Sequence, residues 1–358
     1  MALKLDEYRL LGRSGLRVSP ICFGTMTFGA GDWGSTNEEA KQMVDVYIDR
    51  GGNFFDTANI YGQMGQSEIV LGEAIHALRR DSLVIATKYS LSMFPNDPNA
   101  AGNHRKNMVR AIENSLKRLK TEYIDLYYLH VWDSRTPVDE ILRAFDDLVR
   151  AGKVIYIGLS DTPAWQASRM QAIAELRGWS QFCALQIAYS LMERTVEHEL
   201  IPMAAELGMG VCPWSPLGGG ILTGKYSKSD LARPGGSLSS ISDIKSRKDA
   251  NIMMGQVTEK ALAVAEVVSA IAKETGKTAA QIAVAWTLVN RAVTAPIIGV
   301  RTVAQLKDNL GALDVELDAE QLKRLDAVSS VPPVFPKQML SGPMSAALFG
   351  TAKVEERR

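Results

Sequence analysis

The sequence has little of what marks a secreted, membrane or nucleic-acid-binding protein. Its three cysteines, Cys22, Cys183 and Cys212, lie far apart in apolar runs, which is typical of reduced core residues and not of a disulfide framework or a zinc site. The 40 basic and 40 acidic residues cancel, so the total charge gives no sign of a nucleic-acid partner. No apolar run approaches the roughly 20 residues of a membrane helix, and the first residues contain no signal-peptide apolar region. We therefore expect a cytoplasmic protein with no nucleic-acid or membrane partner.

Three functional signatures are also missing. No G-x-G-x-x-G motif follows the first apolar run, because Gly24, Gly29, Gly31 and Gly34 have the wrong spacing, and this argues against an open dinucleotide-binding sheet. No G-x-S-x-G elbow occurs, which argues against a serine hydrolase. No pair of His or Cys residues has the spacing of metal ligands, so we expect no metal site.

What the sequence does contain is a regular alternation of short apolar runs and longer amphipathic ones. With 358 residues, 46% hydrophobic and 22% charged, the chain has a globular composition, and its length allows one domain or two. Eight runs rich in β-branched or aromatic residues predict strands at 21–26, 53–58, 83–89, 124–130, 154–160, 183–189, 210–216 and 293–299. Amphipathic segments predict helices at 37–50, 68–79, 105–119, 138–151, 163–176, 195–207 and 258–275.

This alternation predicts a single (β/α)8 barrel over residues 1–358, with a core at about 20–330, because eight parallel strands close into a barrel that their own side chains fill. A doubly wound open sheet is the competing fold, but its glycine signature is missing. The segment 12–19 predicts a small hairpin that caps the closed end. The Gly/Ser/Asp-rich stretch 218–251 is long for a loop and therefore expected to be functional. The irregular tail, 331–358, is expected to fold over the open end.

Polar residues close several of the predicted strands. Asp56, Lys88 and His130 end three consecutive strands, and Tyr61 follows Asp56 by one short turn. Because active sites of (β/α)8 barrels lie at the carboxyl ends of the strands, these four side chains should face one another. Later strand ends add the polar residues Ser160, Asp161 and Gln186.

These residue types are suited to proton transfer. A phenol has a pKa near 10, and an ammonium group beside it favours the phenolate and lowers that value. Asp56 can hold Lys88 charged and in place, and His130 can hydrogen-bond the oxygen that Tyr61 protonates. Any one of these residues alone is more often a satisfied rim residue. The conjunction of all four favours a catalytic site.

Seven motifs, in order, resemble the aldo-keto reductase superfamily: "FDTANIYG", "ATKY", "LYYLH", "IGLSD", "LQIAYS", "PWSPLGGGILTGKY" and "IIGVRTVAQLKDN". The resemblance covers roughly Tyr8 to Ser330. Trp214 stands where many members have Tyr, so the chain is most similar to the branch of bacterial general-stress reductases and potassium-channel β subunits. The resemblance implies a barrel that reduces a small-molecule carbonyl substrate with NADPH, with Asp56, Tyr61, Lys88 and His130 as the catalytic tetrad.

The resemblance also implies which residues bind NADPH/NADP+. Near the nicotinamide and its ribose these are Gly24, Thr25, Met26, Asp56, Ser160, Asp161, Gln186 and Trp214. Along the pyrophosphate and at the adenosine end they are Ser215, Leu217, Gly219, Lys225, Gly299, Arg301, Gln305, Asp308 and Asn309. Asp161 departs from the Asn or Arg common after this serine, which puts its contact with the nicotinamide amide in question.

Two alternatives to a carbonyl reductase stay open. One is an NADPH-binding redox sensor that docks to a partner protein, like a channel β subunit. The other is an enzyme that prefers alcohol oxidation. The physiological substrate and the oligomeric state are not predicted, although Tyr89 and Trp132 are expected near the mouth of the barrel, together with the loop that contains Trp33.

Overall fold

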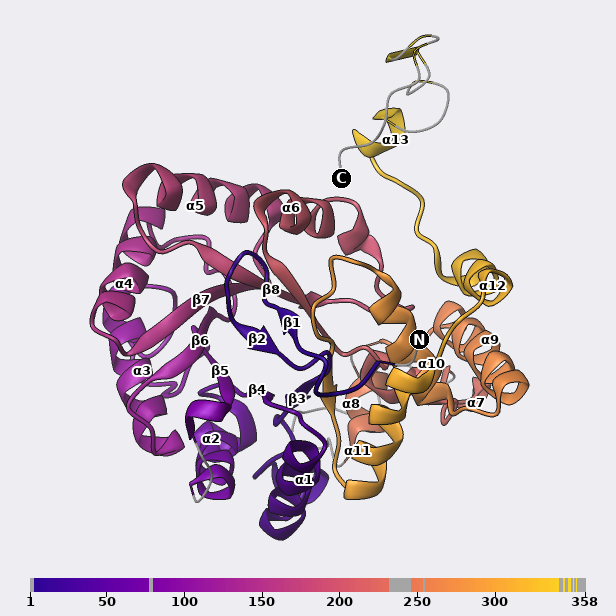
Figure 1. Cartoon of the computed structure of the whole chain (residues 1–358), viewed down its shortest axis with the longest axis horizontal. Coiled ribbons are helices and arrows are strands. Elements are labelled where there is room, and N and C mark those ends of the chain that lie inside the picture. The colour runs from indigo at the N-terminus through magenta and orange to yellow at the C-terminus, as the bar shows by residue number, and fades with distance from the viewer. Residues whose placement is uncertain are drawn as a thin grey trace.

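The computed structural model describes residues 3–76, 80–231, 246–253 and 255–340, together with positions 344, 347, 348, 350 and 352. Its centre is a sheet of eight parallel strands in the order β10-β3-β4-β5-β6-β7-β8-β9. The strands are β3 (Cys22–Gly24), β4 (Phe54–Asp56), β5 (Val84–Tyr89), β6 (Ile124–Leu129), β7 (Val154–Ser160), β8 (Phe182–Ala188), β9 (Gly210–Trp214) and β10 (Ile297–Gly299). A parallel bridge between Val211 and Val293 joins the two ends of the sheet. The sheet is therefore a nearly closed barrel, as predicted (Figure 1).

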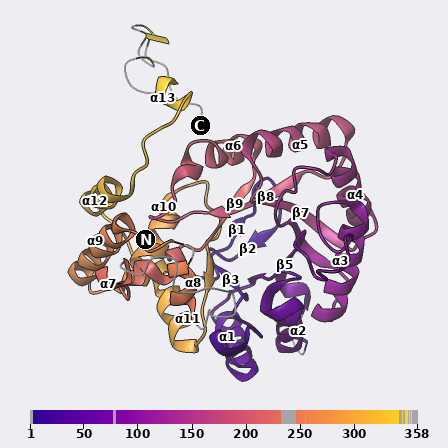
Figure 2. The same ribbon diagram turned by 180° about the vertical axis from the view of Figure 1, so that it is seen from behind.

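Helices surround the barrel on its outside (Figures 1 and 2). Those of the first six βα units are α1 (Asn37–Asp49), α2 (Tyr61–Ile75), α3 (Arg105–Leu119), α4 (Val138–Arg150), α5 (Ala164–Arg177) and α6 (Leu200–Leu207). The later ones are α7 (Lys228–Leu231), α8 (Arg247–Met253), α9 (Glu259–Thr275), α10 (Ala279–Val289), α11 (Val303–Leu310), α12 (Ala319–Ser329) and α13 (Lys337–Leu340). The pattern of the sequence predicts the first group and α9, and the segment after the eighth strand predicts a helix that begins at about Thr302, which is α11; α10 and α12 are not predicted.

Apolar side chains of the described residues form two main cores on either side of the sheet, because successive residues of a strand face opposite sides, and a small third cluster around Ile221 and Leu262. The large core lies between the sheet and the helices and includes buried residues such as Phe145 and Ile157. The smaller core fills the inside of the barrel and includes Phe54, Tyr128 and Cys212. All three cysteines are free and buried, as the sequence predicts.

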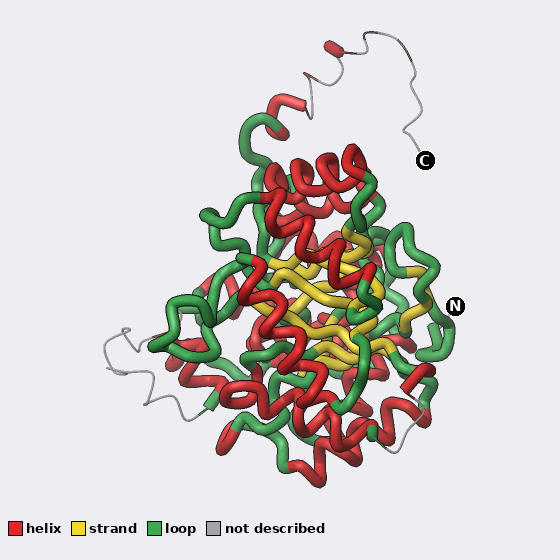
Figure 3. The backbone as a smooth tube through the Cα atoms, turned by 90° about the vertical axis from the view of Figure 1, so that its left-hand side faces the viewer, coloured by secondary structure: helices red, strands yellow, loops and turns green. Residues whose placement is uncertain are grey.

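The predicted hairpin is formed by β1 (Arg9–Leu10) and β2 (Arg17–Val18), which pair antiparallel. Its residues Leu11 and Val18 belong to the small core, so the hairpin closes one end of the barrel (Figure 3). Gly12 has φ 55°, and a Cβ there would lie 2.4 Å from the carbonyl oxygen of Cys183. Only glycine allows the hairpin to lie this close to the barrel.

The tail differs from the expectation. Its described part runs to α13 and projects beside the barrel instead of folding over the open end (Figures 1 and 3). One side-chain hydrogen bond from it reaches the barrel loops, from Lys337 Nζ to the carbonyl of Glu197, and Phe335 is 78% exposed. The predicted functional segment 218–251 contains a short 3-10 helix, η4 (Gly218–Thr223), α7 and α8, and residues 232–245 within it lie outside the described residues.

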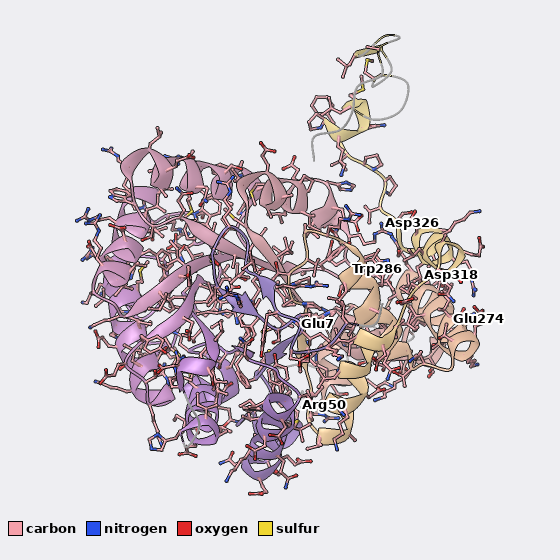
Figure 4. All side chains as sticks on the ribbon, viewed as in Figure 1. Glu7, Arg50, Glu274, Trp286, Asp318 and Asp326 are labelled. Atoms are coloured by element: carbon pink, nitrogen blue, oxygen red, sulfur yellow. The ribbon has the colours of Figure 1, made fainter. Side chains whose placement is uncertain are left out.

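The helix after the last βα unit, α12, is held to the rest of the molecule by charged side chains. Arg194 pairs with Asp326 of α12 at 2.8 Å and lies over the ring of Trp286 of α10 at 5.2 Å (Figure 4). Among the described residues, no helix is long and apolar enough to cross a bilayer.

Candidate active site

The candidate site lies at the carboxyl ends of the strands, where inward-facing residues replace the apolar core with polar groups. On β5, Thr87 donates a hydrogen bond outward to Glu68 of α2, so the next residue, Lys88, faces the inside of the barrel. Gly24 pairs in register with Asp56, and Ser160 with Gln186. These residues therefore form one layer across the mouth, above the apolar interior.

The centre of this layer is a buried ion pair. Lys88 is fully buried, and its Nζ lies 2.5 Å from Oδ1 of Asp56. Lys88 also donates to the carbonyl of Thr57 at 2.8 Å, while Nε2 of Gln186 donates to the other oxygen of Asp56 at 2.8 Å. Burial alone would lower the pKa of Lys88, but Asp56 and Tyr61 oppose it and the net shift of the pKa is upward. Lys88 therefore stays charged at neutral pH.

Tyr61 stands beside this pair because of an unusual turn. The four residues after it, Gly62, Gln63, Met64 and Gly65, all have positive φ, between 56° and 98°. A Cβ on Gly62 would lie 2.2 Å from the carbonyl oxygen of Phe28, so only glycine fits there. The turn separates Tyr61 from the regular part of α2 and brings its phenol oxygen to 3.4 Å from Lys88 Nζ.

The pKa of Tyr61 differs from the expectation. The sequence predicts that Lys88 lowers this pKa, and Lys88 does act in that direction. Burial acts the other way and is larger, so the pKa of Tyr61 is raised above its usual value. The phenol is therefore a protonated group at neutral pH, held next to a cation that stabilises the charge left when the proton leaves.

His130 follows β6 and lies against Tyr61, with ring centroids 5.7 Å apart and ring planes at 81°. Burial, and after it the charge of Lys88, lower the pKa of His130 to about 3. The imidazole is therefore neutral across the physiological range. Its Nδ1 is buried without a hydrogen-bond partner among the described residues, as is the hydroxyl of Ser160. Buried polar atoms of this kind usually have partners, so both atoms are ready to bind a ligand.

The low pKa of His130 predicts how stability changes with pH. The unfolded chain binds a proton at His130 below about pH 6.5, whereas the folded chain does so only near pH 3, so acid favours unfolding between these values. Replacing His130 with Asn should remove this contribution, which amounts to about 1.4 kcal/mol per pH unit in that window. Urea unfolding at pH 7 and pH 4.5 measures it. The exposed His76, changed to Asn, should alter neither value, and an equal pH dependence in wild type and His130→Asn would contradict the prediction.

Asp161 and Trp214 complete the mouth. Asp161 follows Ser160 directly with φ 38°, and its Oδ1 accepts a hydrogen bond of 3.1 Å from Nε1 of Trp214. The indole ring is 36% exposed at the end of β9. An exposed flat aromatic surface beside unpartnered donors suits a planar ring that carries an amide, so these residues fit a nicotinamide.

The loop after β9 has backbone conformations that side chains rarely adopt. Ser215, Gly218, Gly219 and Gly220 all have positive φ. The side chain of Asn251 of α8 lies against Gly219 and donates to its carbonyl at 2.9 Å. Leu217 packs against the large core, and Lys225 is exposed. The described part of the loop therefore presents backbone groups and the exposed ammonium group of Lys225 near the barrel rim.

The loop after β10 leads into α11. Gly299 and Arg301 are exposed, and the side chain of Gln305 accepts from the backbone N–H of Arg301 at 2.9 Å. Asp308 is held by α10, since its Oδ1 accepts from Thr278 and from Gln281. Asn309 is buried. Arg301 is thus the accessible charged group of this loop, whereas the carboxylate of Asp308 already has partners.

The residues expected near the ribose lie where β3 meets β4. Gly24 ends β3, and a Cβ there would lie 2.7 Å from Ile297. The hydroxyl of Thr25 is fully buried and engaged with Ser67 of α2 at 2.8 Å, and Met26 is partly exposed. Thr25 therefore fastens the strand to the helix that carries Tyr61, and Met26 is the side chain of this group that another molecule can reach.

Several features of the site were not predicted. The sequence does not predict that the carbonyl of Thr57 accepts a hydrogen bond from Lys88, or that Gln186 donates to Asp56, because neither contact depends on a motif. It also does not predict that Arg118 of α3 pairs with the buried Glu68 at 2.6 Å and supports the turn after Tyr61. Tyr89 was expected near the mouth, but this is wrong. It is fully buried in the large core, stacked on Tyr127 at 5.3 Å, because it faces outward on β5.

The fold and the site together define a (β/α)8-barrel enzyme whose mouth carries a phenol supported by a buried lysine. The chain belongs to the aldo/keto reductase family, whose model matches residues 20–330. Members of this family generally use NAD(P)H.

Individual relatives agree with this assignment. The chain is 43% identical to the uncharacterized oxidoreductase YrpG of Bacillus subtilis, over 90% of this chain and 95% of the relative. It is 36% identical to the norsolorinic acid reductase of Aspergillus flavus, over 94% and 84%. It is 32% identical to the putative aryl-alcohol dehydrogenase AAD14 of Saccharomyces cerevisiae, over 94% and 90%. The protein is therefore an oxidoreductase.

Proposed function

We propose that this protein reduces aldehydes or ketones to alcohols with NADPH, and that Tyr61 supplies the proton. The observation that carries the proposal is the buried Lys88–Asp56 pair directly beside the Tyr61 phenol and the neutral His130. When bound, the nicotinamide supplies the hydride. The tetrad supplies the proton and the electrostatic support, which is the share of the chemistry that falls to the protein.

Each member of the tetrad has a distinct role in this proposal. The Tyr61 hydroxyl donates its proton to the carbonyl oxygen of the substrate. Lys88, at 3.4 Å, stabilises the phenolate that remains, and Asp56 keeps Lys88 charged and fixed. Neutral His130 donates a hydrogen bond to the same carbonyl oxygen and orients it. General acid catalysis of this kind contributes roughly 10²–10⁴-fold to the rate.

The cofactor would be held by residues on three sides of the mouth. Ser160, Asp161 and Gln186 would contact the nicotinamide amide, and Trp214 would stack on the ring. The loop after β9, with Ser215, Leu217, Gly219 and Lys225, would line the pyrophosphate. The residues proposed for the adenosine end and the ribose are Gly24, Thr25, Met26, Gly299, Arg301, Gln305, Asp308 and Asn309.

The experiment that tests this function is a turnover assay. The purified protein is mixed with NADPH and a panel of aromatic and aliphatic aldehydes, and the nicotinamide absorbance is followed. An ordinary enzyme turns over at about 1–10³ s⁻¹, so many cycles per molecule are expected. Oxidation of one bound NADPH per protein, with no further turnover on any substrate, would support the redox sensor instead.

We also propose that the substrates include aromatic carbonyls. Trp132, two residues after His130, lies edge to face with Trp165 of α5 at 5.4 Å. The indole N–H of Trp132 is buried and has no partner in the described part of the chain, and Trp165 is 59% exposed. Two relatives carry names that refer to an aryl alcohol and to norsolorinic acid. Higher kcat/KM for aromatic than for aliphatic aldehydes in the same panel is the expected result.

Replacing Arg301 tests whether the protein prefers NADPH to NADH. Arg301 is exposed just before α11, where a cation and the free N–H groups of a helix start favour the additional 2′-phosphate of NADPH. Charge-assisted hydrogen bonds are worth about 1.5–3 kcal/mol each. Arg301→Ala should therefore raise KM for NADPH at least about tenfold and leave KM for NADH almost unchanged. Lys307→Ala, which removes an exposed cation from α11 itself, is the matched control. Equal weakening of both cofactors would show that Arg301 is not the phosphate ligand.

A further inference from the structure

Asp161 has a fixed position between three strand ends. It follows Ser160 at the end of β7, and its backbone N–H donates to the carbonyl of Gln186 on β8 at 3.3 Å. Its side chain accepts from the indole N–H of Trp214 at the end of β9. The positive φ of 38° shows that the backbone turns sharply here. The carboxylate is therefore held at the mouth, beside the ring of Trp214.

The other groups of the mouth leave the charge of Asp161 uncompensated. Asp56 and Lys88 form an ion pair and cancel. His130 is neutral because its pKa is lowered to about 3, and Tyr61 is protonated because its pKa is raised. Burial raises the pKa of Asp161 above its usual value, while Trp214 and Lys88 favour its ionised form. Among the tetrad and the residues expected at the nicotinamide, one negative charge remains.

We propose that Asp161 makes this site bind NADP+ more tightly than NADPH, an inference that rests on the proposed function. Hydride transfer requires the nicotinamide ring to lie next to a carbonyl whose oxygen is at Tyr61 and His130, so the ring shares the mouth with Asp161. The carbonyl carbon receives the hydride, with its two electrons, and the oxygen receives a proton from Tyr61. The ring that has given the hydride then carries one positive charge, which the reduced ring lacks.

The expected difference in affinity between NADP+ and NADPH follows from the charges of Asp161 and the oxidised ring. An opposite charge within about 4–6 Å shifts a charge equilibrium by one to three decades. The mouth is partly open to solvent, as the exposure of Trp214 shows, so the lower end of this range, about tenfold, is expected. Each tenfold preference for the oxidised form lowers the potential of a bound two-electron couple by about 30 mV. Asp161 thus makes the bound NADPH a stronger reductant, which favours carbonyl reduction over alcohol oxidation on the enzyme.

The test compares the affinities of the two cofactor forms without any substrate. Calorimetric titrations of the full chain at pH 8 give Kd for NADP+ and for NADPH. In Asp161→Asn, which keeps the shape and an oxygen for Trp214, the ratio of Kd for NADP+ to Kd for NADPH should rise at least about tenfold. Asp161→Glu keeps the charge and should stay near the wild-type ratio. Asp139→Asn removes one exposed carboxylate from α4 and controls for net charge.

The outcomes separate this inference from the function on which it rests. A rise in the ratio in Asp161→Asn, with little change in Asp161→Glu, supports the inference. Equal weakening of both forms, or an unchanged ratio, overturns it and leaves the reductase proposal intact. If wild-type protein binds neither form, both proposals fail. Should Asp161→Asn not fold, Asp161→Ser provides the same comparison.

Discussion

Replacing Tyr61 with phenylalanine is expected to lower kcat for carbonyl reduction by roughly 10²–10⁴-fold, the usual contribution of a general acid. The ring itself should keep its place, because it lies against His130 and over Lys88 Nζ, 4.8 Å from its centroid. Among the described residues, the change removes one hydrogen bond of the phenol, the one to Lys88. The Kd for NADPH should therefore stay within about twofold of wild type, as an order-of-magnitude expectation.

Two controls make this result specific. Tyr8→Phe removes an exposed phenol that donates to the carbonyl of Gly51 and should leave kcat unchanged. Because product release often limits kcat, single-turnover oxidation of NADPH should be followed as well. A Tyr61→Phe enzyme with wild-type single-turnover rates would remove Tyr61 from the role of proton donor.

The parts of the fold that the sequence predicts are those governed by periodicity. The strands are buried on both faces, so each appears as a short continuous apolar run, and the polar residue that ends a run marks the rim of the barrel. The positions of Asp56, Lys88 and His130 at the rim can therefore be predicted from the sequence alone. The eighth run was predicted longer than β10, which spans Ile297–Gly299, because Val293 and its neighbours meet β9 only through a single bridge.

The parts that escaped prediction depend on contacts between distant segments. The helix predicted at 68–79 overlaps α2, which begins earlier, at Tyr61, and ends at Ile75; residues 77–79 lie outside the described residues. Nothing in the sequence indicates that Gln63 and Met64 adopt positive φ there, since this conformation disfavours all residues except glycine. The turn at Gly62–Gly65 is supported by Arg118, whose guanidinium group occupies the space that a side chain on Gly65 would need. Such a fit is visible only when α2 and α3 are packed together.

The pKa of Tyr61 shows a second limit of sequence reasoning. A neighbouring lysine can be predicted from two strand ends, but the degree of burial cannot. For Tyr61 burial is the larger influence and reverses the expected direction of the shift. Asp308 shows the importance of distant contacts again: the resemblance assigns it to the cofactor, but its side chain accepts hydrogen bonds from Thr278 and Gln281 at the start of α10, a helix that the sequence pattern does not predict.

The integrity of the buried Lys88–Asp56 pair should also have a large effect on the free energy of unfolding. Lys88 and Asp56 are nearly inaccessible to solvent, so removing one partner leaves an uncompensated charge in a medium that solvates it poorly. Asp56→Asn and Lys88→Met should each lower the free energy of unfolding by about 3–5 kcal/mol. Replacing a buried pair with neutral groups is often close to neutral for stability, so the double variant should recover a large part of either loss.

A double-mutant cycle measures this coupling, with urea unfolding at pH 7 for all four proteins. Asp56→Asn keeps the shape and one of the two acceptor oxygens that Lys88 and Gln186 use, so the change removes charge more than shape. The exposed pair Arg324–Glu274, labelled in part in Figure 4, is the matched control, and its coupling should not exceed about 1 kcal/mol. All three variants at Asp56 and Lys88 should lose carbonyl reduction, because none retains both the cation beside Tyr61 and the carboxylate that fixes it. Additive losses of stability at Asp56 and Lys88 would mean that the two charges do not depend on each other, and Asp56 would then lose its assigned role of keeping Lys88 charged and in place.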